Sequence, residues 1–376
     1  MRVAIDGRAI MPFLDGIGRY SHCLIEQLRH LDSWNEYIVF VTHPQFDFPA
    51  DSNFREVVLP YRYVHAYTVT HFHRDLNREG ADLLFAPFFL SPPLFRGPVV
   101  LTVHDLIWVT HPELQGQRWR LGDMVKRQAH AWIVPLSLRR ARALLSVSQA
   151  TTAELLAFLP EVAGRVHTIP LGLDHVPVPA TILPMEQRLP YLLFIGNSKP
   201  YKNMAGVIRC FDLLVREAGF SQWRLKIPGR RDSFRGSIQR LLDDLDCRDR
   251  VDLLGPVSEE NLAELYGQAS LLLFPSRMEG FGFPVLEAMR HGTPVVTSNR
   301  SSLPEVAGGC AQLVDPDDVP AMARACAELL GDVARRQELS ARGLEHAAGF
   351  RWENTARATL AVLRQAADGR MSPGPR

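Results

Sequence analysis

The sequence predicts an α/β protein built from two doubly wound parallel-sheet domains. Short, predominantly apolar runs such as LLLF and VVLTV alternate with stretches of helical pattern, as expected for strands covered by helices on both faces. The chain has 376 residues, too many for one ordinary core and about right for two domains. A proline-rich segment near the middle divides the strands into two series.

The expected strands follow one another in chain order. In the first half they lie at residues 3–6, 37–42, 56–59, 82–86, 99–104, 143–148 and 166–169. In the second half they lie at residues 191–195, 224–227, 251–254, 271–275, 294–297 and 311–314. Helical stretches separate most of them, so we expect parallel pairing with right-handed crossovers. An antiparallel sandwich would instead show period-two alternation and hairpin turns, which this sequence lacks.

The segment HVPVPATILPMEQRLP at 175–190 contains the prolines that mark the domain boundary. We expect an N-terminal domain at 1–178, a linker at 179–190, a C-terminal domain at 191–350, a helix at 351–370 that crosses back towards the first domain, and a disordered tail at 371–376. Ligands of such sheets bind outside the carboxyl ends of the strands, so the expected site is a cleft between the domains.

Composition excludes several classes of protein. Hydrophobic residues make up 46% and charged residues 22%, which is ordinary for a globular chain. A net charge of +1 argues against a dedicated nucleic-acid binder. The five cysteines are never spaced as CxxC, so neither a disulfide framework nor a zinc site is indicated. The opening MRVAID lacks the apolar core of a signal peptide, and we expect a cytoplasmic protein.

The best candidate for a ligand site is PSRMEGFGFPVLEAMRHGTPVV at 275–296. An apolar strand leads into a glycine-containing loop, and Pro284 suits the first position of a helix. Backbone amides at 282–285 would then form an anion site at the helix N-terminus. Glu279 and Glu287 could accept hydrogen bonds from hydroxyl groups of one ligand. The alternative is a solvated carboxylate pair around a tight strand–helix turn.

The string EGFGFPVLEA, with Glu279 and Glu287 eight positions apart, resembles the Glu-x7-Glu signature of retaining glycosyltransferases of family 4. Other matching segments occur in order: DGR at 6–8, DGIGRY at 15–20, VHDL at 103–106, VSQATTAEL at 147–155, IPLGLD at 169–174, GNSKPYKN at 196–203, GPVSEENLAELYGQASLLLFPS at 255–276 and LPEVAGG at 303–309. The resemblance covers nearly the whole chain and is greatest to the mannosyltransferase-like branch. It implies the GT-B fold, in which two Rossmann-like domains face each other across a cleft.

The resemblance also implies roles for matching residues. Glu279, Lys202 and His104 would be catalytic: Glu279 would contact the donor sugar, Lys202 would neutralise the diphosphate, and His104 would lie near the reacting centre. The other residues at the nucleotide-sugar donor would be Gly16, Gly18, Asn197, Arg230, Phe281, Gly282, Phe283 and Glu287, the last on the ribose hydroxyls.

On local grounds some of these residues have simpler interpretations. Gly16 and Gly18, between the first strand and the next helix, permit positive φ or close ligand approach, but a purely structural turn explains them equally well. A lone histidine such as His104 is more often a packed residue. Asn197 follows Gly196 where the family usually has arginine, so diphosphate binding would depend more on Lys202, or also on Lys199 or Arg230.

A basic stretch at 115–142 carries seven Lys or Arg against one Asp, a local charge of +6, interleaved with apolar side chains. It suits a phosphate-bearing acceptor or peripheral contact with an anionic membrane, and a solvated helical face is the alternative. The acceptor contacts we expect are Tyr20, Arg118, Trp119 and Arg120. His71 and His73 form HxH without a third ligand, so we expect no metal.

We therefore expect transfer of a hexose from a nucleotide diphosphate sugar to a glycan or lipid-linked hydroxyl in polysaccharide or O-antigen assembly. The resemblance implies retention of configuration without a metal or other cofactor, with GDP-mannose favoured and UDP-sugars second. Two alternatives remain: a UDP-sugar-dependent transferase acting on a small molecule, and a catalytically weak nucleotide-sugar-binding protein. An epimerase or a phosphorylase would share the cleft but not the Glu-x7-Glu pattern.

Overall fold

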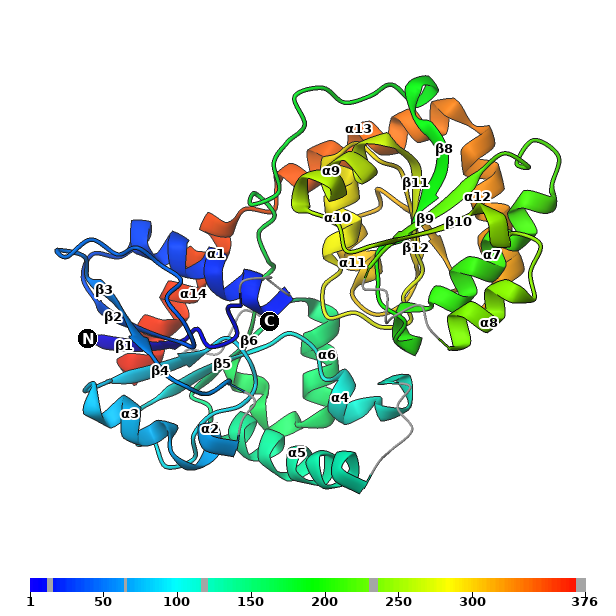
Figure 1. Ribbon diagram of the computed structural model, residues 1–376. Helices are drawn as coiled ribbons and strands as arrows, with labels where there is room; N and C mark the ends of the chain where they lie inside the picture. Colours follow the sequence, from blue (N-terminus) through cyan, green and yellow to red (C-terminus); the bar gives the residue numbers. More distant parts are fainter. Residues whose placement is uncertain (12–15, 64–65, 116–120, 230–235, 370–376) are drawn as a thin grey trace. The chain divides into compact units, whose positions relative to one another are not determined.

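The computed structural model describes residues 1–11, 16–63, 66–115, 121–229 and 236–369, and its strands form two sheets (Figure 1). The seven-stranded sheet has the order β3-β2-β1-β4-β5-β6-β7, with β1 (Arg2–Asp6), β2 (Glu36–Val41), β3 (Phe54–Val58), β4 (Leu83–Ala86), β5 (Val99–Val103), β6 (Ala143–Ser146) and β7 (Val166–Thr168). The six-stranded sheet has the order β10-β9-β8-β11-β12-β13, with β8 (Leu189–Leu193), β9 (Arg224–Pro228), β10 (Val251–Gly255), β11 (Ala269–Phe274), β12 (Val295–Ser298) and β13 (Gln312–Val314).

Every pairing among the described strands is parallel, which confirms the predicted fold class. In each sheet the strand order reverses once, between β1 and β4 and between β8 and β11. Ligands of doubly wound sheets bind beyond the carboxyl ends of the strands at such a reversal. The loops after β8 and β11 are therefore where a ligand site of the second sheet is expected.

Helices connect the strands throughout. Those before residue 176 are α1 (Gly16–Leu31), α2 (Ala66–Thr70), α3 (Phe72–Arg78), α4 (Ile107–Thr110), α5 (Leu121–Arg140) and α6 (Gln149–Phe158), with the 3₁₀ helices η1 (Pro112–Gln115) and η2 (Pro160–Arg165). Those that follow are η3 (Met185–Gln187), η4 (Pro200–Lys202), α7 (Met204–Arg216), α8 (Ser237–Asp243), η6 (Arg248–Arg250), α9 (Glu259–Gln268), α10 (Phe283–Arg290), α11 (Leu303–Ala307), α12 (Val319–Gly331), α13 (Val333–Ala348) and α14 (Trp352–Ala367).

The chain forms two compact units, each with its own apolar core. The first unit contains the seven-stranded sheet together with α14, and the second contains the six-stranded sheet. The second sheet begins at Leu189, and Met185 and Arg188 are buried, so ordered structure extends into the segment expected as a linker.

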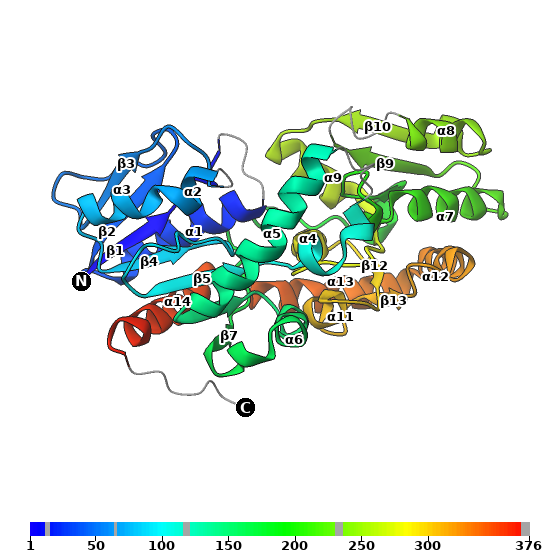
Figure 2. The same cartoon turned by 90° about the horizontal axis from the view of Figure 1, so that it is seen from below.

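The last helix, α14, packs in the first unit beside α1 (Figures 1 and 2). Its first residue, Trp352, is buried and donates its backbone N–H to Asp174 Oδ1 at 2.7 Å. Gly172 makes this docking possible, because a Cβ there would lie 2.2 Å from the Trp352 nitrogen. The start of α14 is thus fixed to the loop after β7.

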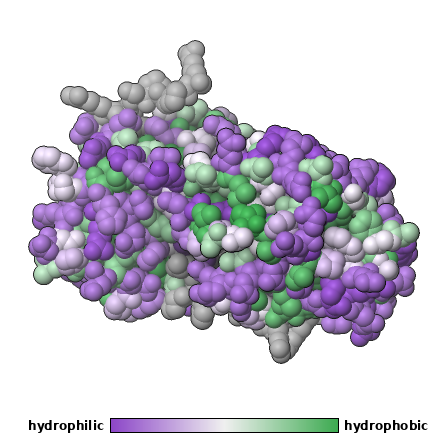
Figure 3. Space-filling view, turned by 90° about the horizontal axis from the view of Figure 1, so that it is seen from above, coloured by the Kyte–Doolittle hydropathy of each residue, from purple (hydrophilic) through white to green (hydrophobic). Residues whose placement is uncertain are grey.

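Polar side chains predominate on the face shown in Figure 3, and hydrophobic ones form small islands between them. None of the helices in the described part of the chain combines the length and apolar character needed to cross a membrane.

Candidate active site

Two of the predicted site residues meet beyond the carboxyl ends of β8 and β11. Lys202 ends η4 in the β8–α7 connection, and Glu279 lies in the loop between β11 and α10. Lys202 Nζ donates to Glu279 Oε1 at 2.7 Å, and the two side chains are only 16% and 11% exposed. The reversal of strand order therefore brings together an ammonium group and a carboxylate that are 77 positions apart in the chain.

The backbone beside Lys202 is fixed by its neighbours. Asn203 adopts a left-handed conformation (φ 59°), and its buried side-chain amide donates to the carbonyls of Pro275 and Pro316 at 3.2 and 2.7 Å. Arg277 donates its backbone N–H to Tyr201 O and its guanidinium Nη1 to Pro200 O, both at 2.7 Å. The loops that carry Lys202 and Glu279 thus hold each other in position.

Two serines that were not among the predicted site residues hold the loop of Glu279 in place. Ser301 accepts the Glu279 N–H at 3.2 Å and donates its hydroxyl to Glu279 O at 2.6 Å. Ser302 donates to Phe281 O at 2.6 Å. Gly282 has φ 119°, and a Cβ there would lie 2.7 Å from Leu303 Cδ2. Only glycine fits this conformation and this close approach.

The predicted anion site at the start of α10 offers fewer backbone amides than expected. Val285 N–H donates to Gly282 O at 3.0 Å, and Pro284 has no N–H to offer. Two of the four positions expected to supply amides, Pro284 and Val285, therefore do not offer one to a ligand.

Glu287 lies one turn into α10, where a residue missed by the sequence reasoning positions it. Tyr266, at the end of α9 and 1% exposed, donates its hydroxyl to Glu287 Oε2 at 2.7 Å. The ring of Tyr266 stacks on His291 at 5.5 Å, and His291 Nδ1 lies 2.7 Å from Glu287 O. The Tyr266 hydroxyl thus fixes one oxygen of the Glu287 carboxylate.

The residue at the family's arginine position forms a turn. Asn197 is exposed, and its Oδ1 accepts the Lys199 N–H at 3.0 Å. This side-chain oxygen closes the turn that leads into η4. Arg230, the other residue expected to assist with the diphosphate, lies outside the described residues.

In the first unit, His104 follows β5 and is partly buried. Its Nε2 lies 3.0 Å from the Pro87 carbonyl, which can only accept a hydrogen bond, so Nε2 carries the proton and Nδ1 is the ring's acceptor. Burial lowers the pKa of His104 to about 4. The imidazole is therefore neutral at physiological pH.

Tyr20 packs edge-on against His104 at 4.7 Å between ring centroids. It is 2% exposed, its hydroxyl lies 3.0 Å from Thr102 Oγ1, and burial raises its pKa. This placement favours packing beneath His104 over the acceptor contact expected from the sequence.

The glycines of the first unit differ from expectation. Gly16 and Gly18 lie in the first turn of α1 instead of the preceding loop, and neither has positive φ. Gly16 is exposed, whereas Gly18 is buried.

The predicted acceptor residues Arg118, Trp119 and Arg120 lie outside the described residues. Within the described part of the basic stretch, Arg139 pairs with Glu161 at 2.7 Å and Arg140 donates to the carbonyls of Pro93 and Phe95. These two cations have structural partners. Among the described residues, no cluster of three or more His, Cys, Asp or Glu side chains could hold a metal ion.

The environment of His104 predicts acid sensitivity. Because its pKa is about 4 when folded and about 6.5 when unfolded, the unfolded chain binds more protons between these pH values. The contribution of His104 to the free energy of unfolding is therefore present above pH 6.5 and falls by up to about 3 kcal/mol as the pH drops to 4.

Urea unfolding from pH 4 to 7 measures this dependence. We expect the pH dependence to be shallower in His104→Asn than in wild type. The control is His30→Asn, which removes an exposed histidine of α1 and should leave the wild-type slope. Equal slopes for wild type and His104→Asn would refute the prediction.

Comparison with known families identifies both halves of the chain. Residues 14–176 match the family described as Glycosyltransferase Family 4, and residues 189–332 match Glycosyl transferases group 1. O-antigen chain mannosyltransferase B of Escherichia coli is 32% identical over 96% of this chain and 98% of its own length. The MMP alpha-(1->4)-mannosyltransferase of Mycolicibacterium hassiacum is 30% identical over 72% of this chain and 66% of its own length.

Solved structures share the fold. Sucrose-phosphate synthase from Thermosynechococcus elongatus superposes with a TM-score of 0.75 at 22% identity, covering 98% of this chain and 99% of that one. WaaG, described as a glycosyltransferase involved in lipopolysaccharide biosynthesis, gives a TM-score of 0.69 at 17% identity, covering 99% and 100% of the two chains.

Proposed function

The chain belongs to glycosyltransferase family 4, and from this premise we propose that it transfers mannose from GDP-mannose to a hydroxyl group of a glycan or lipid-linked acceptor, with retention at the anomeric carbon. The observation that carries the proposal is the ion pair of Lys202 and Glu279 beyond the carboxyl ends of β8 and β11. The relatives named as mannosyltransferases support mannose as the sugar.

In this proposal the chain binds the two ends of the nucleotide sugar with different groups. Lys202 contacts the diphosphate, Glu287 accepts hydrogen bonds from the ribose, and Glu279 orients the hexose beside the amides around Gly282. His104 offers its Nδ1 to a hydroxyl near the reacting carbon. The ammonium group of Lys202 has three N–H bonds, so it can keep Glu279 while it binds a phosphate oxygen.

The proposed step is a front-face displacement. The bond between the anomeric carbon and the diphosphate oxygen breaks, the acceptor oxygen bonds to the same face of that carbon, and the acceptor proton passes to the departing diphosphate. Lys202 stabilises the negative charge on the leaving group, and Glu279 faces the developing positive charge of the sugar. The proposal requires neither a metal nor another cofactor.

Calorimetric titration with GDP, UDP and ADP tests the base. Selective binding of GDP, followed by mannose transfer measured with GDP-mannose in the presence of EDTA, is the expected result. NMR of the product reports the anomeric configuration. Selective binding of UDP would replace the base in the proposal, and binding of none of the three by folded protein would overturn the assignment of this site.

We also propose a cytoplasmic enzyme that contacts an anionic membrane peripherally. On the described part of α5, the side chains of Trp132 and Leu136 are 74% and 52% exposed, which supports contact with lipid. Co-sedimentation with vesicles of anionic and of neutral phospholipids tests this proposal. Equal sedimentation with both would contradict it.

The contact between Tyr266 and Glu287 predicts a defect confined to nucleotide binding. Tyr266→Phe removes one hydrogen bond to a charged carboxylate, so we expect the Kd for GDP to rise about tenfold while kcat at saturating GDP-mannose is unchanged. For 2′-deoxy-GDP and 3′-deoxy-GDP, which each lack one ribose hydroxyl, the Kd should differ less between wild type and variant than it does for GDP.

Tyr191→Phe provides the matched control. Tyr191 is also buried in the second unit, and its hydroxyl donates to Leu265 O at 2.7 Å without contacting Glu287. This variant should bind GDP as wild type does. A similar loss of GDP affinity in both variants would show a general structural defect and contradict the positioning role of Tyr266.

A further inference from the structure

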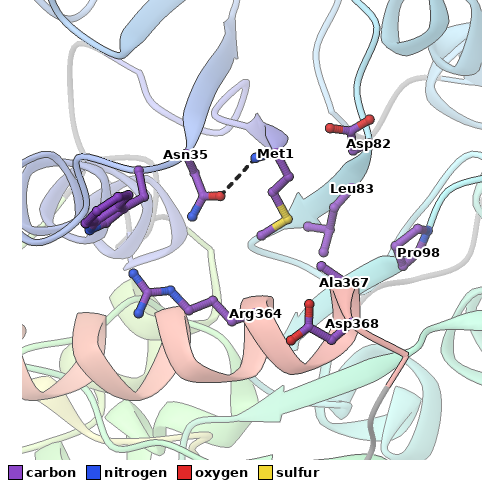
Figure 4. A pocket seen from close by; sticks show the side chains of 9 residues that line it. Met1, Asn35, Asp82, Leu83, Pro98, Arg364, Ala367 and Asp368 are labelled. Atoms are coloured by element: carbon purple, nitrogen blue, oxygen red, sulfur yellow. Dashed lines mark hydrogen bonds between the residues drawn. The ribbon is translucent and has the colours of Figure 1, made fainter.

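We propose that a pocket at the amino ends of the first unit's strands binds a segment of the glycan acceptor. The choice of a glycan rests on the proposed function. The pocket has a volume of about 710 Å³ and is formed by residues of the first unit alone. Its lining residues are Met1, Trp34, Asn35, Asp82, Leu83, Pro98, Arg364, Ala367 and Asp368 (Figure 4).

The pocket is separate from the loops assigned to the nucleotide sugar. Leu83 is the first residue of β4, and Met1 and Pro98 immediately precede β1 and β5. The pocket thus lies at the edge of the sheet opposite to His104, which follows the carboxyl end of β5. Its volume falls within the range of about 300–1,000 Å³ that is usual for small-ligand sites.

Trp34 supplies an aromatic surface held by a rigid turn. The Trp34 side chain is 87% exposed, yet its backbone N–H donates to Asp32 Oδ1 at 3.0 Å. Asp32 is buried and also accepts hydrogen bonds from Asn35 Nδ2 at 2.5 Å and from the Tyr37 hydroxyl at 2.7 Å. These bonds fix the backbone at Trp34, and its exposed indole can pack on an apolar ring face.

Polar groups surround the same opening. Figure 4 shows the side chains of Arg364, in the last turn of α14, of Asp368, at the C-terminal cap of this helix, and of Asp82, which immediately precedes β4. Asp82 Oδ2 accepts the Arg2 N–H at 2.7 Å, and Arg364 Nη2 lies 3.4 Å from Asp32 Oδ1. These bonds fix a guanidinium donor and a carboxylate acceptor at the rim.

This lining fits a neutral, polyhydroxylated ligand better than a charged one. Two carboxylates, Asp82 and Asp368, offset the Arg364 guanidinium, and the amino group of Met1 donates to Asn35 Oδ1 at 3.2 Å. The pocket therefore has no excess positive charge for a phosphate. A pyranose ring has one face of C–H groups for the indole and equatorial hydroxyls for the carboxylates and guanidinium.

The position of the pocket adds a length requirement. A five-residue strand spans roughly 17 Å, so the amino and carboxyl edges of β1 and β5 lie about that far apart. An acceptor held in the pocket and reacting beyond the carboxyl edge must therefore be several sugar residues long. The pocket would favour elongation of a growing chain over transfer to a short acceptor.

Fluorine NMR of protein labelled with 5-fluorotryptophan tests binding directly. The chain has six tryptophans, and Trp34→Phe assigns the resonance of Trp34 by its disappearance. We expect α-linked mannotetraose to shift this resonance saturably in the absence of any nucleotide. Asp368→Asn combined with Arg364→Gln should abolish the shift. Inorganic phosphate should leave the resonance unchanged.

Transfer assays with acceptors of two lengths test the use of the pocket. Trp34→Ala should raise the KM for a mannotetraose acceptor about tenfold, as expected for loss of an aromatic contact, and leave the KM for methyl mannoside unchanged. The matched control is Val58→Ala, which removes a 52% exposed apolar side chain of the same unit outside the pocket. This control should behave as wild type with both acceptors.

The outcomes separate this inference from the proposed function. Failure of mannotetraose to shift the Trp34 resonance, or a shift with phosphate instead, would overturn the glycan pocket even if GDP binds normally. Equal KM changes for both acceptor lengths would also overturn it. If folded wild-type protein did not bind GDP, the proposed donor site would be overturned. A saturable shift of the Trp34 resonance with mannotetraose would still support the pocket.

Discussion

Lys202→Met is expected to lower kcat/KM for transfer by about 10²–10³-fold, because it removes the cation assigned to the leaving diphosphate. The Kd for GDP should rise about 10- to 100-fold, as expected for loss of a charge-assisted hydrogen bond. The variant also leaves the Glu279 carboxylate without its 2.7 Å partner, beside an anionic ligand. The missing cation and the unpaired carboxylate both weaken binding of GDP, and both also destabilise the transition state.

Steady-state kinetics with GDP-mannose and calorimetry with GDP measure the two effects. Lys226→Met is the control, since it removes a lysine of the same unit that lies over the Tyr191 ring. Lys202→Arg should recover only part of the activity, because a planar guanidinium on a longer side chain cannot place its charge at the same point. Wild-type turnover by Lys202→Met would show that this lysine does not stabilise the leaving group.

The strands were predictable because burial in a parallel sheet leaves a direct mark on the sequence. Val99–Val103 and Ala269–Phe274 are buried along their whole length, so both appear as predominantly apolar runs, with one hydroxyl residue in each. Each expected strand is present, with ends that differ by one or two residues. The ends depend on the registers of neighbouring strands, which one sequence does not contain. Leu189 shows this, since it pairs with Ala269 although the strand was expected from residue 191.

The candidate site was predictable only where a motif named its residues. The loop–helix pattern around Pro284 and the family resemblance led to Lys202 and Glu279. In the structure, Lys202 Nζ lies 2.7 Å from Glu279 Oε1. Tyr266 and Ser301 act through contacts 21 and 22 positions away, so no local pattern distinguishes them from ordinary core and loop residues.

The glycines of the first unit show what a local pattern leaves open. Glycine permits positive φ but does not require it, so the composition of a loop cannot establish its conformation. Gly16 begins α1 without positive φ, whereas Gly282, in a similar sequence context, has φ 119°. A Cβ at Gly282 would lie 2.7 Å from Leu303 Cδ2, whereas a Cβ at Gly16 would meet no atom of the described residues within 4 Å.

Glu279→Gln is expected to reduce kcat by about 10²–10³-fold through loss of the charge that faces the developing positive charge of the sugar. In contrast to Lys202→Met, it should bind GDP at least as tightly as wild type. The carboxylate repels the diphosphate and competes with it for the Lys202 ammonium, and the neutral amide does neither. The amide oxygen can still accept a hydrogen bond from Lys202, so the loops should keep their positions.

If Lys202→Met weakens GDP binding and Glu279→Gln strengthens it, while both lose turnover to a similar extent, the two residues of this ion pair have different roles. If Glu279 served only to hold Lys202 in place, both variants would weaken GDP binding, and the double variant would be no worse than Lys202→Met. If Glu279 acts on the sugar, the double variant should bind GDP weakly and also lose turnover beyond Lys202→Met alone. Thermal unfolding of all three variants provides the control, since only variants that remain folded at the assay temperature report on the roles of these side chains in binding and turnover.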